Sequence, residues 1–257
     1  YEIASCLVGS EMCIRDSIFI GHGVGPLAIS GLALTFPLMN LAAAFGSLVG
    51  VGAATLISMR LGQRDYETAQ RVLGNVLVLN LIIGISFGLA ALLFLDPILY
   101  FFGASEATIG YAREYMTVIL LGNVVTHMYL GLNSVLRASG HPRKSMYATI
   151  NTVVINTILD PLFIFGFGWG IRGAAIATVL AQVISLVWQL RILSNKQELL
   201  HFRRGIYRLR KKIVRDMLAI GMSPFLMNLA ACFIVILINK GLKAVSYTHL
   251  RAHETRG

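Results

Sequence analysis

The chain of 257 residues is 56% hydrophobic and only 13% charged, with a mean hydropathy of +0.72. Soluble globular domains carry about 25% charged residues, so this composition excludes an ordinary soluble domain. The formal net charge of +10 would suit a nucleic-acid-binding protein, but the basic residues gather in alternate junctions between apolar runs, which argues against a nucleic-acid partner.

Two short segments near the ends of the chain resemble one laboratory oligonucleotide. Leu7–Ser17 resembles the translation of a transposase adapter used in sequencing libraries, and Val245–Glu254 resembles the translation of its reverse complement. Such segments are left out of fold reasoning. We therefore expect residues 1–17 and 245–257 not to be native, with two genuine polar tails as the alternative. Cys232 is then the one native cysteine, and no pair remains for a disulfide.

Six apolar runs between these segments match the length of about 20 residues that a helix needs to cross a bilayer. A shorter run, Ile18–Gly25, has the composition of the end of an earlier span. The sequence therefore predicts an all-α, polytopic transmembrane helix bundle. The six runs are Leu32–Ile57, Val72–Leu95, Tyr115–Leu136, Met146–Phe167, Ala174–Leu193 and Met217–Ile238.

Basic residues gather in every second junction between these runs. The positive-inside rule places such junctions in the cytoplasm. We expect the last and most basic of them to be a connector lying on anionic lipid headgroups, with an RNA-binding arm as the weaker alternative. The basic junctions hold Arg60, Arg64 and Arg71, then Arg137, Arg143 and Lys144, then Arg191, Lys196, Arg203, Arg204, Arg208, Arg210, Lys211, Lys212 and Arg215, against Arg113, Arg172, Lys240 and Lys243 elsewhere.

Asp160 is the one acidic residue within these apolar runs. An ionisable group in the hydrocarbon region costs at least about 2.5 kcal/mol, so it usually faces a bundle interior or a water-filled cavity and serves ion or substrate transport. Asn156 lies one helical turn earlier, and Thr152, Thr149 and Ser145 continue the same face at spacings of three and four. The polar stripe predicts the wall of a transport cavity.

Pro161 directly follows Asp160, and Pro37 lies within the first complete run. A proline lacks the backbone donor and clashes with the carbonyl four residues earlier, so each proline predicts a helix kink. At Pro161 the kink would free the Thr157 carbonyl beside Asp160. Together with the Asn156 amide, these oxygen atoms would suit Na⁺ or a proton relay. The alternative is a packing kink, with Asp160 satisfied by a neighbouring helix.

The motifs that would identify an enzyme are missing from the sequence. It holds no CxxC pair, HExxH, Walker loop or dinucleotide fingerprint. We therefore expect a protein that is not an enzyme, with no catalytic residues, no cofactor beyond a coupling ion, and no metal site except a possible Na⁺ site at Asp160 and Asn156.

Four stretches resemble the multidrug and toxic compound extrusion (MATE) family of bacterial transporters, and the resemblance covers about residues 18–243. It implies a twelve-helix fold of two six-helix lobes. Residues 18–194 would form the amino-terminal lobe with a truncated first helix, 195–215 the cytoplasmic connector, and 216–244 the first helix of the second lobe. The stretches are FIGHGVGPLAISGLALTFP (Phe19–Pro37), GVGAATLISMRLGQRDYETAQRVLGN (Gly50–Asn75), LNSVLRASGHPRKSM (Leu132–Met146) and INTILDPLFIFGFGWGIRGAAIATVLAQ (Ile155–Gln182).

The resemblance also implies a function and a site. Family members exchange drugs, often cationic and apolar, for H⁺ or Na⁺, so we expect a secondary antiporter in the bacterial inner membrane, acting as a monomer. The implied site residues are Asp160, Asn156, Thr178 and Asn133. The family also has an acid late in its first helix, where Asp16 stands within the adapter-like segment.

A lipid-linked oligosaccharide flippase of related architecture is the alternative function. Such flippases need a larger cavity, often lined by arginine. We expect Arg113 and Arg172 to lie in loops, which favours small cationic substrates. A membrane-embedded sensor or enzyme is a further alternative, although no motif supports it.

Overall fold

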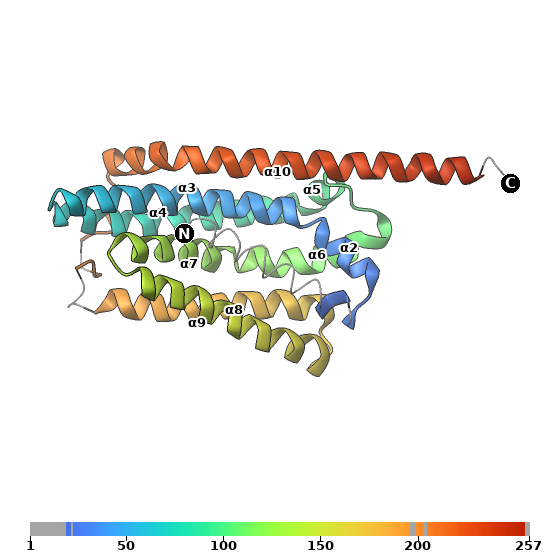
Figure 1. Ribbon diagram of the computed structural model, residues 1–257, viewed down its shortest axis with the longest axis horizontal. Helices are drawn as coiled ribbons and strands as arrows, with labels where there is room; N and C mark the ends of the chain where they lie inside the picture. Colours follow the sequence, from blue (N-terminus) through green and yellow to red (C-terminus); the bar gives the residue numbers. More distant parts are fainter. Residues whose placement is uncertain (1–18, 22, 196–198, 203–204, 255–257) are drawn as a thin grey trace.

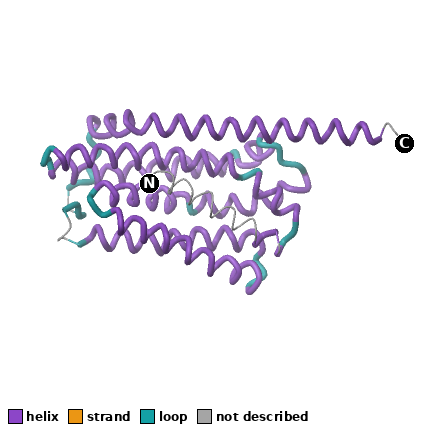
Figure 2. The backbone as a smooth tube through the Cα atoms, viewed as in Figure 1, coloured by secondary structure: helices purple, strands orange, loops and turns teal. Residues whose placement is uncertain are grey.

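The computed structural model describes residues 19–21, 23–195, 199–202 and 205–254, with side chains described as far as Leu237. In this part of the chain every regular element is a helix (Figures 1 and 2). The adapter-like segment 1–17, with Asp16, lies outside the described residues. Val245–Glu254 forms the end of the last helix, and its side chains are not described.

Five helical segments are long and apolar enough to cross a membrane, and a bent pair of helices makes a sixth if it is counted as one span. The all-α, multi-span architecture predicted from the apolar runs is confirmed. The helices are α2 (Pro26–Ala33), α3 (Phe36–Gly62), α4 (Tyr66–Leu93), α5 (Leu95–Phe101), α6 (Glu106–Leu121), α7 (Asn123–Ala138), α8 (Pro142–Pro161), the π-helix η1 (Leu162–Gly166), α9 (Gly170–Ser194) and α10 (Lys211–Glu254).

Two of the expected spans are interrupted. The first is divided into α2 and α3, and Pro37 lies in the first turn of α3 rather than inside one continuous helix. A proline there costs little, because first-turn amides have no partner within the helix. The third span is divided at Gly122, where α6 and α7 meet at 56°. A Cβ on Gly122 would collide with Val179, so this glycine lets α9 approach the bend.

Capping residues start the helices where the chain leaves a junction. Asp65 precedes α4, and its carboxylate accepts the Thr68 backbone N–H at 3.1 Å. Ser105 precedes α6, and its backbone N–H donates to the Thr108 hydroxyl at 3.1 Å within a capping box. These contacts satisfy groups that the first turn of a helix leaves unpaired.

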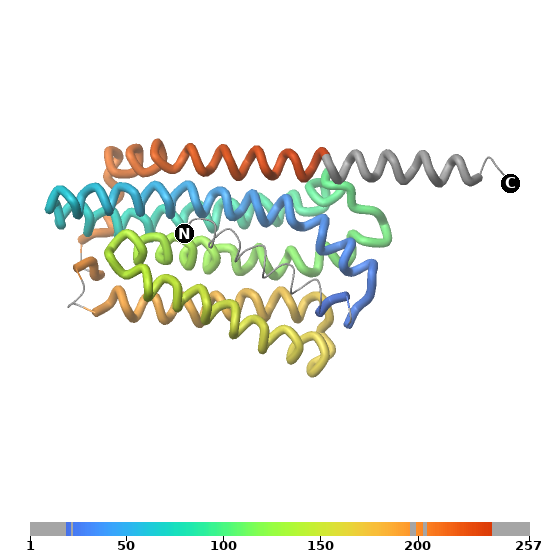
Figure 3. Tube along the Cα trace, viewed as in Figure 1, coloured from blue at the N-terminus to red at the C-terminus, as the bar shows by residue number. Residues whose placement is uncertain are grey.

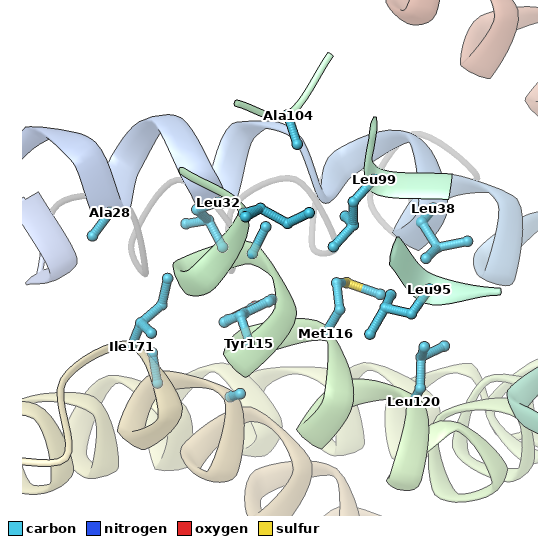
Figure 4. Packing of buried hydrophobic residues seen from close by; sticks show 14 of the residues in the cluster. Ala28, Leu32, Leu38, Leu95, Leu99, Ala104, Tyr115, Met116, Leu120 and Ile171 are labelled. Carbon is cyan, nitrogen blue, oxygen red and sulfur yellow. The ribbon is translucent and has the colours of Figure 1, made fainter. Parts of the chain in front are cut away.

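Two apolar clusters fill the interior of the bundle. One lies among α2, α5, α6 and the start of α9 and includes Leu32, Leu99 and Tyr115 (Figure 4). The other joins α3, α4, α7 and α9 and includes Leu73 and Leu132. Within a bilayer, such clusters stabilise the bundle through close packing rather than through exclusion of water.

The last helix, α10, lies along α3 (Figure 3). A Cβ on Gly52 would overlap the Met217 carbonyl, and a Cβ on Gly221 would overlap the Leu48 carbonyl. The two glycines therefore let the backbones of the two helices touch. The helix begins at Lys211, earlier than the expected boundary at residue 216.

The connections α3–α4, α7–α8 and α9–α10 all lie at one end of the bundle (Figure 1). These are the basic junctions of the sequence. The strict alternation of charge along the sequence thus becomes a separation of charge in space.

Candidate ion and substrate site

The polar stripe lies on α8 and faces the interior of the bundle. Thr152, Asn156 and Asp160 are 1%, 0% and 0% exposed, whereas Val154 and Ile158 on the opposite face are 49% and 62% exposed. The helix turns its apolar face outwards because lipid cannot satisfy polar groups. Thr152, Asn156 and Asp160 are thus enclosed between helices, and the expectation that the stripe lines a transport cavity stays a prediction.

Asn156 joins Asp160 to the neighbouring helix. Its side-chain amide Nδ2 donates to Asp160 Oδ1 at 3.0 Å and to the Thr178 hydroxyl of α9 at 3.2 Å. Thr178 is 5% exposed. The three residues form a buried cluster across α8 and α9, which we call the Asp160 cluster.

The Asp160 cluster lies where the backbone of α8 changes its bonding. The helix ends at Pro161, which has no N–H to donate, and the chain continues directly as η1. The Phe167 N–H then bonds the Leu162 carbonyl, five residues earlier, at 3.0 Å. Single π-helical turns of this kind are frequent at functional sites.

Pro37 lies apart from this change in bonding. It occupies the first turn of α3, and its carbonyl accepts the Cys232 thiol of α10 at 3.2 Å. Its contact therefore joins α3 to α10.

Asn133 contacts the other end of the stripe. Its Nδ2 donates to the Thr149 hydroxyl at 3.1 Å, and its Oδ1 accepts the Ser145 hydroxyl. Ser145 and Asp160 are separated by about 22 Å along α8, from the rise of 1.5 Å per residue. The structure therefore brings together Asp160, Asn156 and Thr178, and it places Asn133 in a second polar group between α7 and α8.

A matching stripe on α9 was missed at the sequence level. Ser185 accepts the Thr152 hydroxyl at 2.6 Å, and Gln182 accepts the Thr126 hydroxyl of α7 at 2.6 Å. Gln189 is fully buried. Together with Thr178, these residues recur at spacings of four, three and four, so the pattern that found the α8 stripe would also have found this one.

Two buried amides in these stripes have polar atoms without a hydrogen-bond partner among the described residues. They are Asn156, through Oδ1, and Gln189, through both Oε1 and Nε2. A buried amide oxygen can take its partner from a bound water or a cation, whereas a buried amide N–H needs an acceptor such as water. A clustered site with three or more His, Cys, Asp or Glu side chains does not occur in the part of the chain that the structure describes. The oxygen atoms of the Asp160 cluster suit H⁺ or Na⁺ better than a transition metal.

Comparison with known proteins identifies the family. A model of the MatE family matches residues 3–162. The chain belongs to the MATE family. It is 32% identical over 225 residues to the multidrug export protein MepA of Staphylococcus haemolyticus (strain JCSC1435), covering 86% of this chain and 50% of that protein. It is 29% identical to MepA of Staphylococcus aureus (strain MRSA252), covering 88% of this chain and 50% of that protein.

Solved structures agree with this assignment. An inward-facing multidrug resistance MATE family transporter of the MOP superfamily has a TM-score of 0.83 at 27% identity, covering 88% of this chain and 51% of that one. A MATE crystal structure in a bent conformation has a TM-score of 0.81 at 29% identity, covering 85% and 49%. The chain thus spans about half the length of the relatives that it matches, and the MATE fold expected from the resemblance is confirmed.

Proposed function

We propose that this chain contributes to a secondary antiporter that exports apolar organic cations in exchange for H⁺ or Na⁺, with Asp160 as the coupling carboxylate. The observation that carries the proposal is the full burial of Asp160 in a hydrogen-bonded cluster across two membrane helices. The multidrug export relatives support drug export. The oxygen ligands of the cluster suit either H⁺ or Na⁺.

Proton or Na⁺ binding at Asp160 would remove the net charge from the buried cluster. An uncompensated charge in the membrane interior is costly, so the free energy of the bundle changes with occupancy. Asn156 transmits the change to α9, because one amide group bonds both Asp160 and Thr178. The change of charge at Asp160 occurs next to Pro161 and the π-helix η1. At this irregular backbone segment the end of α8 can change its direction. This arrangement favours alternating access driven by ion binding.

Asp160→Asn is the direct test. The asparagine keeps the size of the side chain but cannot alternate between a charged and a neutral state. In the transporter that contains this chain, we expect efflux of a fluorescent cationic dye to fall to the level of cells lacking the transporter, with unchanged abundance in the membrane. Efflux at the wild-type rate would exclude Asp160 from coupling.

Asp96→Asn is the matched control. Asp96 is an exposed carboxylate that pairs with Arg113 at 2.8 Å, outside the Asp160 cluster. The same chemical change there should leave dye efflux unchanged. Efflux from proteoliposomes under an imposed proton gradient or an imposed Na⁺ gradient then identifies the coupling ion.

The flippase alternative receives less support. Arg113 lies within α6 and Arg172 in the first turn of α9, rather than in loops as expected. Arg113 pairs with Asp96, and Arg172 pairs with Glu114 at 3.0 Å. These two separate arginines, each paired with a carboxylate, give little support to an arginine-lined cavity for a large anionic headgroup. The inner membrane, a monomer and a cytoplasmic basic end belong to the same proposal.

A further inference from the structure

The segment between α9 and α10 lies directly on α4. Leu200 and Ile206 are 1% and 6% exposed. Gln70 of α4 donates to the His201 carbonyl, and a Cβ on Gly74 would overlap the Ile206 carbonyl. The described parts of this segment are therefore a fixed part of the bundle surface rather than a loose tether.

One buried side chain fixes two arginines of this segment. Asn75 of α4 is fully buried. Its Oδ1 accepts the Arg210 backbone N–H at 3.0 Å, and its Nδ2 donates to the Arg208 carbonyl at 3.5 Å and to the Arg71 carbonyl at 2.7 Å. Because a buried amide must keep its hydrogen bonds, Asn75 holds the backbone of Arg208 and Arg210 beside Arg71.

The three arginines surround one cavity of about 300 Å³, together with Gly205 and Ile206. Gly205 has a φ of 95°, and a Cβ there would meet nothing within 4 Å, so the turn leaves the cavity open. We call this site the arginine pocket (Arg71, Arg208 and Arg210).

The arginine pocket has an excess of positive charge. Arg71 pairs with Glu67, whose side chain is 76% exposed. Arg208 and Arg210 make no ion pair with any residue that the structure describes. Three positively charged residues line one cavity and repel each other, so an anion in the cavity would stabilise the arrangement.

We propose that the arginine pocket binds the phosphate of an anionic phospholipid headgroup. Arginine binds phosphate oxygens through two parallel hydrogen bonds, which makes it the preferred residue for this group. Tyr207 and Leu209 alternate with Arg208 and Arg210 and are 47% and 46% exposed, so apolar surface lies beside the pocket for the lipid body.

The place of the pocket in the fold favours a lipid over a soluble phosphate compound. It lies where the apolar helix α4 begins and the spanning helix α10 is about to begin, close to Lys211 and Lys212. Basic pockets between membrane helices on the cytoplasmic side bind anionic headgroups. A lipid there would join α4 to the connector, and this inference does not depend on the role of Asp160.

Native mass spectrometry of the whole chain in mild detergent, titrated with phosphatidylglycerol, tests the proposal. We expect the wild type to retain one phosphatidylglycerol molecule. Arg208→Gln/Arg210→Gln should weaken its binding at least about tenfold, because charge-assisted hydrogen bonds are lost. The matched control is Arg143→Gln/Arg191→Gln, which removes the same charge from exposed residues at the same end of the bundle and should bind like the wild type.

Three outcomes would overturn the proposal. Equal weakening in both double variants would mean that the lipid is held by general basic charge. Displacement by inorganic phosphate as effectively as by a short-chain phosphatidylglycerol would mean that the ligand is a soluble anion. If the glutamine variant does not fold, Arg208→Lys/Arg210→Lys keeps the charge; binding at wild-type strength by that variant would exclude recognition by the guanidinium groups.

Discussion

Asp65 shows how one charged side chain couples the start of a membrane helix to pH. Its carboxylate caps α4 and accepts the Thr68 backbone N–H. The hydrogen bonds from the Thr68 hydroxyl and backbone N–H, together with the nearby Arg60 and Arg71, lower the pKa of Asp65 below its ordinary value of 3.8. A lowered pKa in the folded state means that the ionised carboxylate stabilises the fold.

This stabilisation is complete above the unfolded-state pKa and is lost as the pH falls through the lower, folded-state pKa. Asp65→Asn keeps a capping oxygen but cannot ionise, and Asp65→Ala loses both. We expect the melting temperature of Asp65→Asn to lie below that of the wild type near pH 7 and to converge with it below pH 3.8. Asp65→Ala should be less stable than Asp65→Asn at every pH. If the melting temperatures of the wild type and Asp65→Asn differed by the same amount at every pH, the ionised carboxylate would not be the source of the stabilisation.

At the scale of elements, the contact between α3 and α10 depends on two glycines. A Cβ on Gly221 would overlap the carbonyl of Leu48, which is backbone and cannot rotate away. Small residues at such crossings let helices pack closely in membranes. The position of α10 along the bundle therefore depends on the absence of a side chain at both Gly52 and Gly221.

Gly221→Ala should lower the stability of the chain by about 1–3 kcal/mol, the usual cost of overpacking a close contact. Gly62→Ala is the matched control, because a Cβ on Gly62 at the end of α3 would meet nothing within 4 Å. That variant should stay within about 0.5 kcal/mol of the wild type. Thermal unfolding in detergent compares the two, and equal stability would show that the helices separate without cost.

The helices could be predicted from the sequence better than the breaks within them. Hydropathy predicts α4 and α9 because a helix that crosses the bilayer needs a long apolar run. The close approach of α9 to the bend at Gly122 involves Val179, a residue of another helix, so no local pattern reports it. In the same way, the Asp160–Asn156 pair follows from helical spacing, whereas its bond to Thr178 depends on how α8 meets α9.

At the scale of the whole molecule, charge is separated between the two ends of the bundle. The α3–α4, α7–α8 and α9–α10 connections carry the basic junctions at one end (Figure 1). At the opposite end Arg113 and Arg172 are paired with carboxylates. Positive charge is retained on the cytoplasmic side during insertion, so this separation predicts one orientation in the membrane.

Cysteine labelling of spheroplasts tests that orientation. The background protein has Cys6, Cys13 and Cys232 replaced by alanine. Gln63→Cys at the basic end and Ala107→Cys at the opposite end introduce thiols at exposed positions. A membrane-impermeant maleimide should label Ala107→Cys in intact spheroplasts and Gln63→Cys only after lysis. The reverse pattern would place the basic end outside. It would also remove the arginine pocket from the anionic cytoplasmic leaflet, where surface charge attracts basic segments by about 1 kcal/mol per residue. The same pair of thiols therefore tests the orientation that the proposed binding of an anionic lipid at the arginine pocket assumes.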